Sequence, residues 1–342
     1  MSKIMVTGGT GYIGSHTIIE LIKKGGFDVI SVDNCVRSTP ETIGRIKNIT
    51  GKRVENYFVD ICDKEKLFQL FEEENDIIGI IHFAALKSVP ESVEKPLEYY
   101  RNNLQSLENV LEACEIFSIP NFIFSSSCSI YGEVEKLPVS EETLVGAPFC
   151  PYAHTKQIGE EMIRFFADIH PKLSFVMLRY FNPVGADMSG LNGELSPEKP
   201  NNLMPIITQV GIGKMQKMKV FGTDYNTRDG SCIRDYVHVT DIADAHIKAL
   251  DFLVEGRNKS NLEVFNLGSG TGVTVLEMIH AFERITGVKL NYVLGERRPG
   301  DVPAIYSNSN KAERELGWTC KYSLDDMIIS AWQWENYLKN NA

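Results

Sequence analysis

The chain has 342 residues, of which 43% are hydrophobic, so it is long enough to bury a substantial core in one or two domains. Its 35 basic and 45 acidic residues give a net charge of -10, which argues against a nucleic-acid or anionic-membrane surface, because either would need clustered Lys and Arg. We therefore expect a small-molecule ligand, with neither nucleic acid nor membrane as a partner.

The cysteines and the N-terminus favour a reduced, cytoplasmic protein. Seven cysteines show neither a CxxC pair nor a zinc-type Cys/His spacing, and the seven histidines have no ligand-like pairing, so no metal site is expected. The first residues run directly into a strand-like segment without the charged and apolar regions of a signal peptide. No apolar run approaches the ~18 residues that span a bilayer.

Short apolar runs alternate with amphipathic segments along the first half of the chain. The predicted strands are 4–6, 29–32, 77–83 and 122–125, and the predicted helices are 14–24, 64–73 and 95–117. The run 77–83 is almost continuously apolar, as is typical of a central buried strand. This alternation indicates an α/β fold with a doubly wound parallel (Rossmann) sheet, covered by helices on both faces.

After about residue 181 the alternation loosens. Segments rich in Gly, Pro and Asn, such as 182–205 and 221–231, separate predicted helices at 239–255, 274–286 and 323–340. Long irregular segments in a compact protein are often binding loops. We therefore expect a Rossmann domain at 1–181 and a smaller, loop-rich α/β domain at 182–342 that holds the ligand. A strand near 263–267 is expected to rejoin the first sheet.

A glycine-rich segment follows the first predicted strand. Gly8, Gly11 and Gly14 lie between this strand and a helix, where glycines allow a tight turn and close approach of a pyrophosphate to the helix N-terminus. Asp33 ends the second strand about 20 residues further on, which is the spacing of an acid that binds a ribose hydroxyl. A carboxylate repels the 2′-phosphate of NADP, so NAD is the predicted cofactor, although Arg37 lies nearby.

A tyrosine and a lysine share one face of a predicted helix. Tyr152 and Lys156 are i and i+4 after Pro151. The strand before this helix ends in Ser125, Ser126 and Ser127, at the carboxyl edge where open α/β sheets bind ligands. Hydroxyls at a strand end, followed about 25 residues later by Tyr-x-x-x-Lys, make up the arrangement of short-chain dehydrogenase/reductases.

Electrostatics explain why such a tyrosine needs a cation. A phenol with a pKa near ~10 must fall by about three units, or about 4 kcal/mol, to act as a base at neutral pH. One cation ~5 Å away in an effective dielectric of ~20 supplies about 3.3 kcal/mol. Lys156 together with the positive nicotinamide of NAD⁺ would supply the rest. We therefore expect the base to be strongest when oxidised cofactor is bound.

With these motifs, the sequence resembles the extended short-chain dehydrogenase/reductases and, within them, the family of UDP-glucose (UDP-galactose) 4-epimerases. The resemblance covers nearly the whole chain. The blocks that carry it are VTGGTGYIGSHT at 6–17, HFAALK at 82–87, KPLEYY at 95–100, FSSS at 124–127, LRYFNPVGA at 178–186, PNNLMP at 200–205 and RDYVHV at 234–239.

The resemblance implies an isomerase that inverts C4 of a UDP-hexose through a transient 4-keto intermediate. Tyr152 would take the proton of the sugar 4-hydroxyl, Ser127 would assist, and Lys156 would hold the nicotinamide ribose. The implied cofactor contacts are Gly8, Gly11, Tyr12, Ile13, Gly14, Asp33, Asn34, Ser38, Asp60, Ile61, Phe83, Ala84, Ala85, Lys87, Asn102, Ser125, Tyr152, Lys156, Tyr180 and Phe181. The implied UDP-sugar contacts are Ser127, Tyr152, Asn182, Asn202, Leu203, Phe221, Arg234, Tyr236, Arg298, Asp301 and Ile305.

One of these positions departs from the family pattern. Ile305 stands where the resemblance implies a gate beside the sugar 2-substituent, and a bulky tyrosine there is associated with non-acetylated sugars. Because isoleucine is smaller, we hypothesise additional activity on UDP-GlcNAc and UDP-GalNAc.

Two other functions and the oligomeric state stay open at this point. A nucleotide-sugar 4,6-dehydratase or decarboxylase would share the fold, but the segment after Ser127 offers no carboxylate for such chemistry. A non-catalytic NAD-sensing regulator would usually lack the Tyr/Lys pair. The family resemblance favours a homodimer; the apolar residues available for a two-helix interface, or equally for core packing, are Leu104, Leu107, Leu111, Ile158 and Met162.

Overall fold

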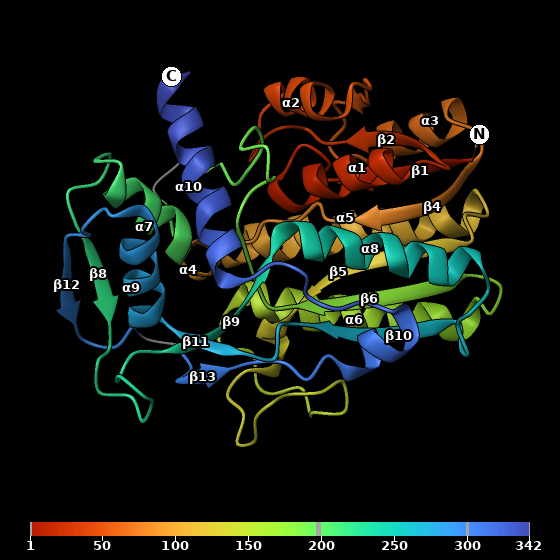
Figure 1. Ribbon diagram of the computed structural model, residues 1–342. Coiled ribbons are helices and arrows are strands. Elements are labelled where there is room, and N and C mark those ends of the chain that lie inside the picture. The colour runs from red at the N-terminus through yellow and green to blue at the C-terminus, as the bar shows by residue number, and fades with distance from the viewer. Residues whose placement is uncertain (1, 196–199, 299–300, 342) are drawn as a thin grey trace.

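A computed structural model of the chain describes residues 2–195, 200–298 and 301–341 (Figure 1). Its largest element is a seven-stranded sheet in the order β10-β6-β5-β4-β1-β2-β3, with every neighbouring pair parallel. The strands are β1 (Lys3–Thr7), β2 (Asp28–Val32), β3 (Glu55–Tyr57), β4 (Ile77–His82), β5 (Asn121–Ser127), β6 (Ser174–Tyr180) and β10 (Leu262–Leu267). The predicted doubly wound sheet is confirmed.

Helices cover both faces of this sheet. Successive strand side chains point to opposite faces, and both faces are apolar, since Ile123 and Phe124 belong to two separate hydrophobic clusters. One face carries α1 (Tyr12–Lys24), α2 (Glu41–Thr50) and α8 (Val239–Val254). The other carries α3 (Lys64–Glu73), α5 (Pro96–Ile116) and α6 (Pro151–Ile169), with the short α4 (Val89–Glu94) beside α5 and α6.

A smaller part of the molecule stands beside the carboxyl edge of the large sheet (Figure 1). A four-stranded sheet contains β7 (Asn182–Val184), β9 (Ile233–His238), β11 (Gly272–Thr274) and β13 (Ala304–Ile305). A two-stranded sheet pairs β8 (Met218–Phe221) with β12 (Tyr292–Gly295). Helices α7 (Leu203–Gly211), α9 (Val275–Thr286) and α10 (Leu324–Asn340) pack around a third hydrophobic cluster. Two single-turn elements, η1 (Cys128–Tyr131) and η2 (Ala312–Leu316), complete the described chain.

The second half of the chain also contributes to the large sheet. Strand β10 pairs with β6 along its whole length, and α8 packs against α1, β5 and β6. The segment 263–267, expected from the sequence to rejoin the first sheet, lies within β10. Part of the predicted loop 182–205, residues 196–199, lies outside the described residues.

The sequence missed α2, β3, α4, β6, α7 and the short strands of the second half, and it began the first helix at Gly14, two residues after the observed start at Tyr12. Strand β3 has the sequence ENY and therefore carries no apolar run. Leu107 and Leu111, which were open to either a dimer face or core packing, lie buried in the core of the chain itself. Among the described residues, no helix has the length and apolarity needed to cross a bilayer.

Candidate active site

The turn between β1 and α1 depends on two glycines. Gly8 has a φ of +70°, and a Cβ there would lie 2.9 Å from the backbone nitrogen of Ala84. A Cβ on Gly14 would lie 2.2 Å from the carbonyl oxygen of Gly8. Helix α1 starts at Tyr12 after Gly11, which has no side chain to cap the first N–H groups. The backbone here can therefore approach a ligand closely at a helix N-terminus.

Asp33 lies beside this turn. Its carboxylate accepts hydrogen bonds from the backbone N–H of Thr10 at 3.1 Å and from the Ser38 hydroxyl at 3.2 Å. The Asn34 side chain accepts from the N–H of Val36 and so shapes the following turn. The Arg37 guanidinium forms an ion pair with Glu91.

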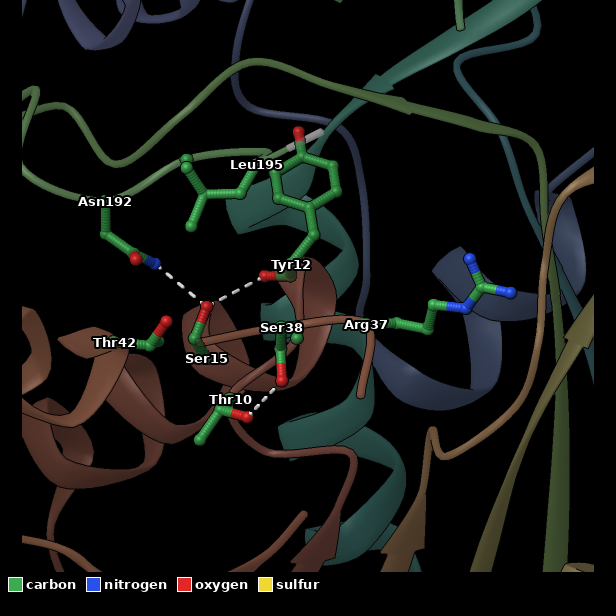
Figure 2. A pocket seen from close by; sticks show the side chains of 10 residues that line it. Thr10, Tyr12, Ser15, Arg37, Ser38, Thr42, Asn192 and Leu195 are labelled. Carbon is green, nitrogen blue, oxygen red and sulfur yellow. Dashed lines mark hydrogen bonds between the residues drawn. The ribbon is translucent and has the colours of Figure 1, made fainter. Parts of the chain in front are cut away.

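A small cavity of about 20 Å³ lies at the N-terminus of α1 (Figure 2). Ser15 donates to the carbonyl of Tyr12 and accepts from Asn192 at 2.9 Å, so segment 192–195 rests against the first turn of the helix (Figure 2). The lining residues are Thr10, Gly11, Tyr12, Ser15, Arg37, Ser38, Thr42, Asn192, Gly193 and Leu195. This space is enough for about one water molecule.

Other sequence-predicted cofactor residues follow neighbouring strand ends. Phe83, Ala84 and Ala85 come directly after β4, and the N–H of Ala84 lies 3.4 Å from the Thr7 hydroxyl. Ile13 lies in the first turn of α1 and packs against the core.

Asp60 and Ile61 follow β3, the edge strand opposite β10, and Asn102 lies on α5. The Asp60 carboxylate accepts from the N–H of Cys62, whose thiol lies 3.5 Å from the carbonyl oxygen of Asn102. Ile61 is buried. The Asn102 amide donates to Asn103, which in turn donates to Thr155 on α6, so this group is joined to the helix that carries Tyr152.

Hydroxyl groups gather where β5 and β6 end. Ser125 and Tyr180 share a hydrogen bond with an O–O distance of 2.6 Å, and the Ser126 hydroxyl donates to Glu160 at 2.6 Å. Phe181 is buried directly after β6. The carboxyl edge of the sheet thus places Ser125, Ser127 and Tyr180 together, as parallel strands require.

Helix α6 brings Tyr152 and Lys156 to the same edge. Lys156 is only 5% exposed, and its ammonium donates to the carbonyl of Ser125 at 2.6 Å. The same nitrogen lies 6.0 Å from the centre of the Tyr152 ring, and the Ser127 side chain is close enough to Tyr152 to oppose the rise in its pKa. Ser127, Tyr152 and Lys156 therefore converge on one point beside the end of β5.

Burial dominates the protonation of this pair. It raises the pKa of Tyr152 well above the ordinary value, with Tyr180 adding to the rise and Ser127 opposing it. Burial also lowers the pKa of Lys156 to about 8, although Glu160 opposes this shift. Burial therefore favours the protonated form of Tyr152 in the polypeptide alone, and the expectation that Lys156 and the oxidised cofactor together create the base stays a prediction.

Sequence reasoning missed a buried ion pair that supports the site. Arg179 on β6 contacts both carboxylate oxygens of Glu160 on α6, at 2.8 and 2.6 Å. The same carboxylate accepts from Ser126, so α6 is tied to β5 and β6 next to Lys156. The i,i+4 spacing of Lys156 and Glu160 was the available signal, since it places Glu160 on the same helix face.

The predicted substrate residues of the second half also lie close together around β9. Asp301 accepts from Arg298 at 2.7 Å and from Arg234 at 3.4 Å, and Arg298 lies 5.6 Å from the centre of the Phe221 ring. The remaining neighbours come from strand pairing: Ile305 pairs with Arg234, and Asn182 with Tyr236.

A second group contains Lys87, Asn202 and Leu203. Asn202 precedes α7 and Leu203 begins it. The Lys87 ammonium and the Asn202 amide both donate to the same oxygen of Glu194, each at 2.8 Å. Glu194 was not singled out in the sequence, because a single acidic residue in an irregular segment carries no local signal.

Comparisons with known proteins show the family of this chain. The family model described as GDP-mannose 4,6 dehydratase matches residues 5–330. The UDP-glucose 4-epimerase of Haemophilus influenzae is 45% identical over 338 residues, covering 99% of this chain and 98% of that protein. The Bifidobacterium longum UDP-glucose 4-epimerase in complex with NAD⁺ and UDP has a TM-score of 0.94 at 43% identity, with 100% of both chains covered. The Campylobacter jejuni UDP-Glc/GlcNAc 4-epimerase has a TM-score of 0.84 at 36% identity, covering 98% of this chain and 100% of that one.

The fold and the Ser/Tyr/Lys arrangement define an extended short-chain dehydrogenase/reductase. Within that class, the chain belongs to the UDP-glucose 4-epimerase family, to which it is similar over almost its full length.

Proposed function

We propose that this protein is an NAD-dependent isomerase that interconverts UDP-glucose and UDP-galactose. The observation that carries this proposal is the convergence of Ser127, Tyr152 and Lys156 at the carboxyl end of β5. The full-length similarity to UDP-glucose 4-epimerases supports it. The matched family model is described as a 4,6-dehydratase, but the residues that follow Ser127 are Cys128 and Ser129, which supply no carboxylate for elimination.

The residues around the glycine turn fit a dinucleotide. Gly8 and Gly14 allow a tight turn in which a Cβ would collide with neighbouring backbone, and the uncapped start of α1 suits a pyrophosphate. Asp33 suits a ribose hydroxyl. The B. longum neighbour is described as a complex with NAD⁺ and UDP, which supports NAD as the cofactor. When bound, NAD supplies a hydride acceptor for C4 of the sugar and the hydride that later returns.

The side chains of this protein supply proton transfer and orientation. Tyr152 takes the proton of the sugar 4-hydroxyl, helped by Ser127. The C4 carbon is a ketone until a hydride returns to it. Because burial raises the pKa of Tyr152, the phenolate needs more positive charge than Lys156 provides. A bound oxidised cofactor adds that charge, so the base strengthens when the first step requires it.

The UDP part is assigned to the residues around β9 and the start of α7. Arg234 and Arg298 suit a diphosphate because guanidinium groups bind phosphate oxygens in a forked geometry. Asp301, which accepts from both arginines, holds them side by side. The remaining proposed contacts are Asn182, Asn202, Leu203, Phe221 and Tyr236. Tight binding of UDP allows the keto sugar to rotate within the site, so that its other face is presented, without dissociating.

The activity is tested with purified protein and UDP-galactose, without added NAD, by coupled detection of UDP-glucose. We expect turnover, and we expect Tyr152→Phe to lower kcat by about 10² to 10⁴ fold, because the general base is lost. Binding of UDP, measured by calorimetry, should be retained by the variant. An unimpaired phenylalanine variant would show that Tyr152 is not the base.

We further propose activity on N-acetylated UDP-hexoses. Ile305 is buried in β13 beside Arg234, and it is smaller than tyrosine. The C. jejuni neighbour, described as a UDP-Glc/GlcNAc 4-epimerase, supports this proposal. Ile305→Tyr should reduce conversion of UDP-GlcNAc while conversion of UDP-glucose persists, with both rates measured on the same preparation. If the wild type and Ile305→Ala are equally inert towards UDP-GlcNAc, the proposal is wrong.

We also propose that the protein is a cytoplasmic homodimer. Its seven cysteines are free, as suits a reducing compartment. Helices α5 and α6 pack side by side and expose large apolar side chains, with Phe165 74% and Ile169 72% exposed. Sedimentation velocity at micromolar concentration should give a single species of twice the monomer mass. A Phe165→Glu variant should sediment as a monomer.

A further inference from the structure

Glu194 connects a residue assigned to the cofactor with one assigned to the substrate. Its side chain is only 11% exposed, and one carboxylate oxygen accepts from both Lys87 and Asn202, each at 2.8 Å. Lys87 follows β4, and its ammonium lies 5.7 Å from the centre of the Tyr12 ring in the glycine turn. Asn202 directly precedes α7 in the other part of the molecule.

The backbone of Glu194 is held from two sides. The Trp334 indole N–H on α10 donates to its carbonyl at 2.9 Å, and a Cβ on the preceding Gly193 would lie 2.5 Å from the same indole ring. Asn192 donates to Ser15 on α1 (Figure 2). The Glu194 carboxylate therefore belongs to a segment that is fixed by contacts with both α1 and α10.

The partners of Glu194 depend on it for their orientation. An asparagine at a helix N-cap normally accepts from a first-turn N–H, but Asn202 makes no such bond, and its amide donates to Glu194 instead. The Lys87 side chain is 57% exposed, so its ion pair with Glu194 is screened and contributes little to overall stability. We therefore interpret the contact as orienting the Lys87 ammonium and the Asn202 amide and not as stabilising the fold.

We propose that Glu194 is a positioning residue that couples the dinucleotide site to the UDP site. The proposal rests on the proposed function. The shared carboxylate oxygen directs Lys87 towards the cofactor and Asn202 towards UDP, so a change at either donor is transmitted to the other. By linkage, a protein with its dinucleotide bound then holds UDP more firmly, and the reverse also applies.

A double-mutant cycle on UDP binding tests this coupling. Calorimetry would measure the UDP affinity of the wild type, Glu194→Ala, Lys87→Met and the double variant. We expect Glu194→Ala to weaken UDP binding about 10-fold. Lys87→Met should weaken UDP binding in the wild-type background and have no further effect in the Glu194→Ala background. NAD released on denaturation should decrease in both single variants.

Two further variants serve as controls. Glu112→Ala removes a surface ion pair with Lys64 and should leave UDP affinity and NAD content unchanged. Glu194→Gln keeps the side-chain shape and removes the charge. It replaces Glu194→Ala in the double-mutant cycle if the alanine variant does not fold. Melting temperatures recorded for every variant should stay within a few degrees of the wild type.

Two results would overturn the coupling: unchanged UDP affinity in both Glu194 variants, or an equal effect of Lys87→Met in both backgrounds. Failure of the proposed function itself is distinguishable, because the wild type would then neither bind UDP nor release NAD on denaturation.

Discussion

At the scale of one residue, the buried charge of Lys156 is required by the proposed function but lowers the stability of the fold. The side chain is almost fully buried as a cation beside the carbonyl of Ser125. Burial lowers its pKa from 10.5 in an exposed chain to about 8, and the negative charge of Glu160 opposes this shift without cancelling it. A residue kept for its charge in a dry site destabilises the fold at neutral pH.

Replacing Lys156 with methionine should therefore stabilise the protein at pH 7, by up to about 3 kcal/mol. Between pH 8 and 10.5 the unfolded chain binds a proton at this lysine that the folded chain does not, so wild-type stability rises with pH through this window. The advantage of Lys156→Met should accordingly shrink between pH 8 and 10.5. Urea unfolding at several pH values measures both quantities. A stability difference that does not change across this window would contradict the expectation.

At the scale of one element, the start of α1 needs glycine for a reason that does not apply to Gly44 in α2. Gly14 lies within α1, where a Cβ would collide with the carbonyl oxygen of Gly8. Gly44 lies within α2, where a Cβ would meet nothing within 4 Å. Substituting alanine at the two positions therefore distinguishes the effect of close packing on stability from the effect of helix propensity.

Gly14→Ala should destabilise the protein and remove bound NAD, because the turn after β1 must shift to admit the methyl group. Gly44→Ala should instead stabilise it by roughly 0.5–1 kcal/mol, since alanine loses less backbone entropy in a helix. Guanidinium unfolding and the NAD content of denatured protein measure the two effects. The packing argument is refuted if Gly14→Ala retains both wild-type stability and bound NAD.

At the scale of the whole molecule, the large sheet is completed by residues from both halves of the chain. Strand β10 protects the β6 edge, and α8 covers α1, β5 and β6 with buried side chains such as Ile242 and Leu250. The division into an NAD-binding domain at 1–181 and a UDP-sugar-binding domain at 182–342 stays a proposal about function.

A fragment of residues 1–181 should not fold by itself, because it lacks β10 and α8 and would expose the apolar surface that they cover. Circular dichroism should show no cooperative thermal transition for the fragment, in contrast to the full chain. Cooperative unfolding of the fragment together with NAD binding would show that the first half is an independent domain.

The sequence by itself determined the class of fold and the chemistry expected of it. Hydrophobic periodicity and glycine spacing act over a few residues, and therefore they predicted the parallel sheet, the turn at Gly8 and the pairing of Tyr152 with Lys156 on one helix face. Short β3 carries no such pattern and was missed.

The tertiary structure decided which distant residues meet and how deeply they are buried. The pairing of Glu160 with Arg179, and the meeting of Lys87 and Asn202 at Glu194, join segments that only the strand order brings together. Burial also raises the pKa of Tyr152 in the polypeptide alone, because desolvation depends on every surrounding segment and not on the spacing of two residues.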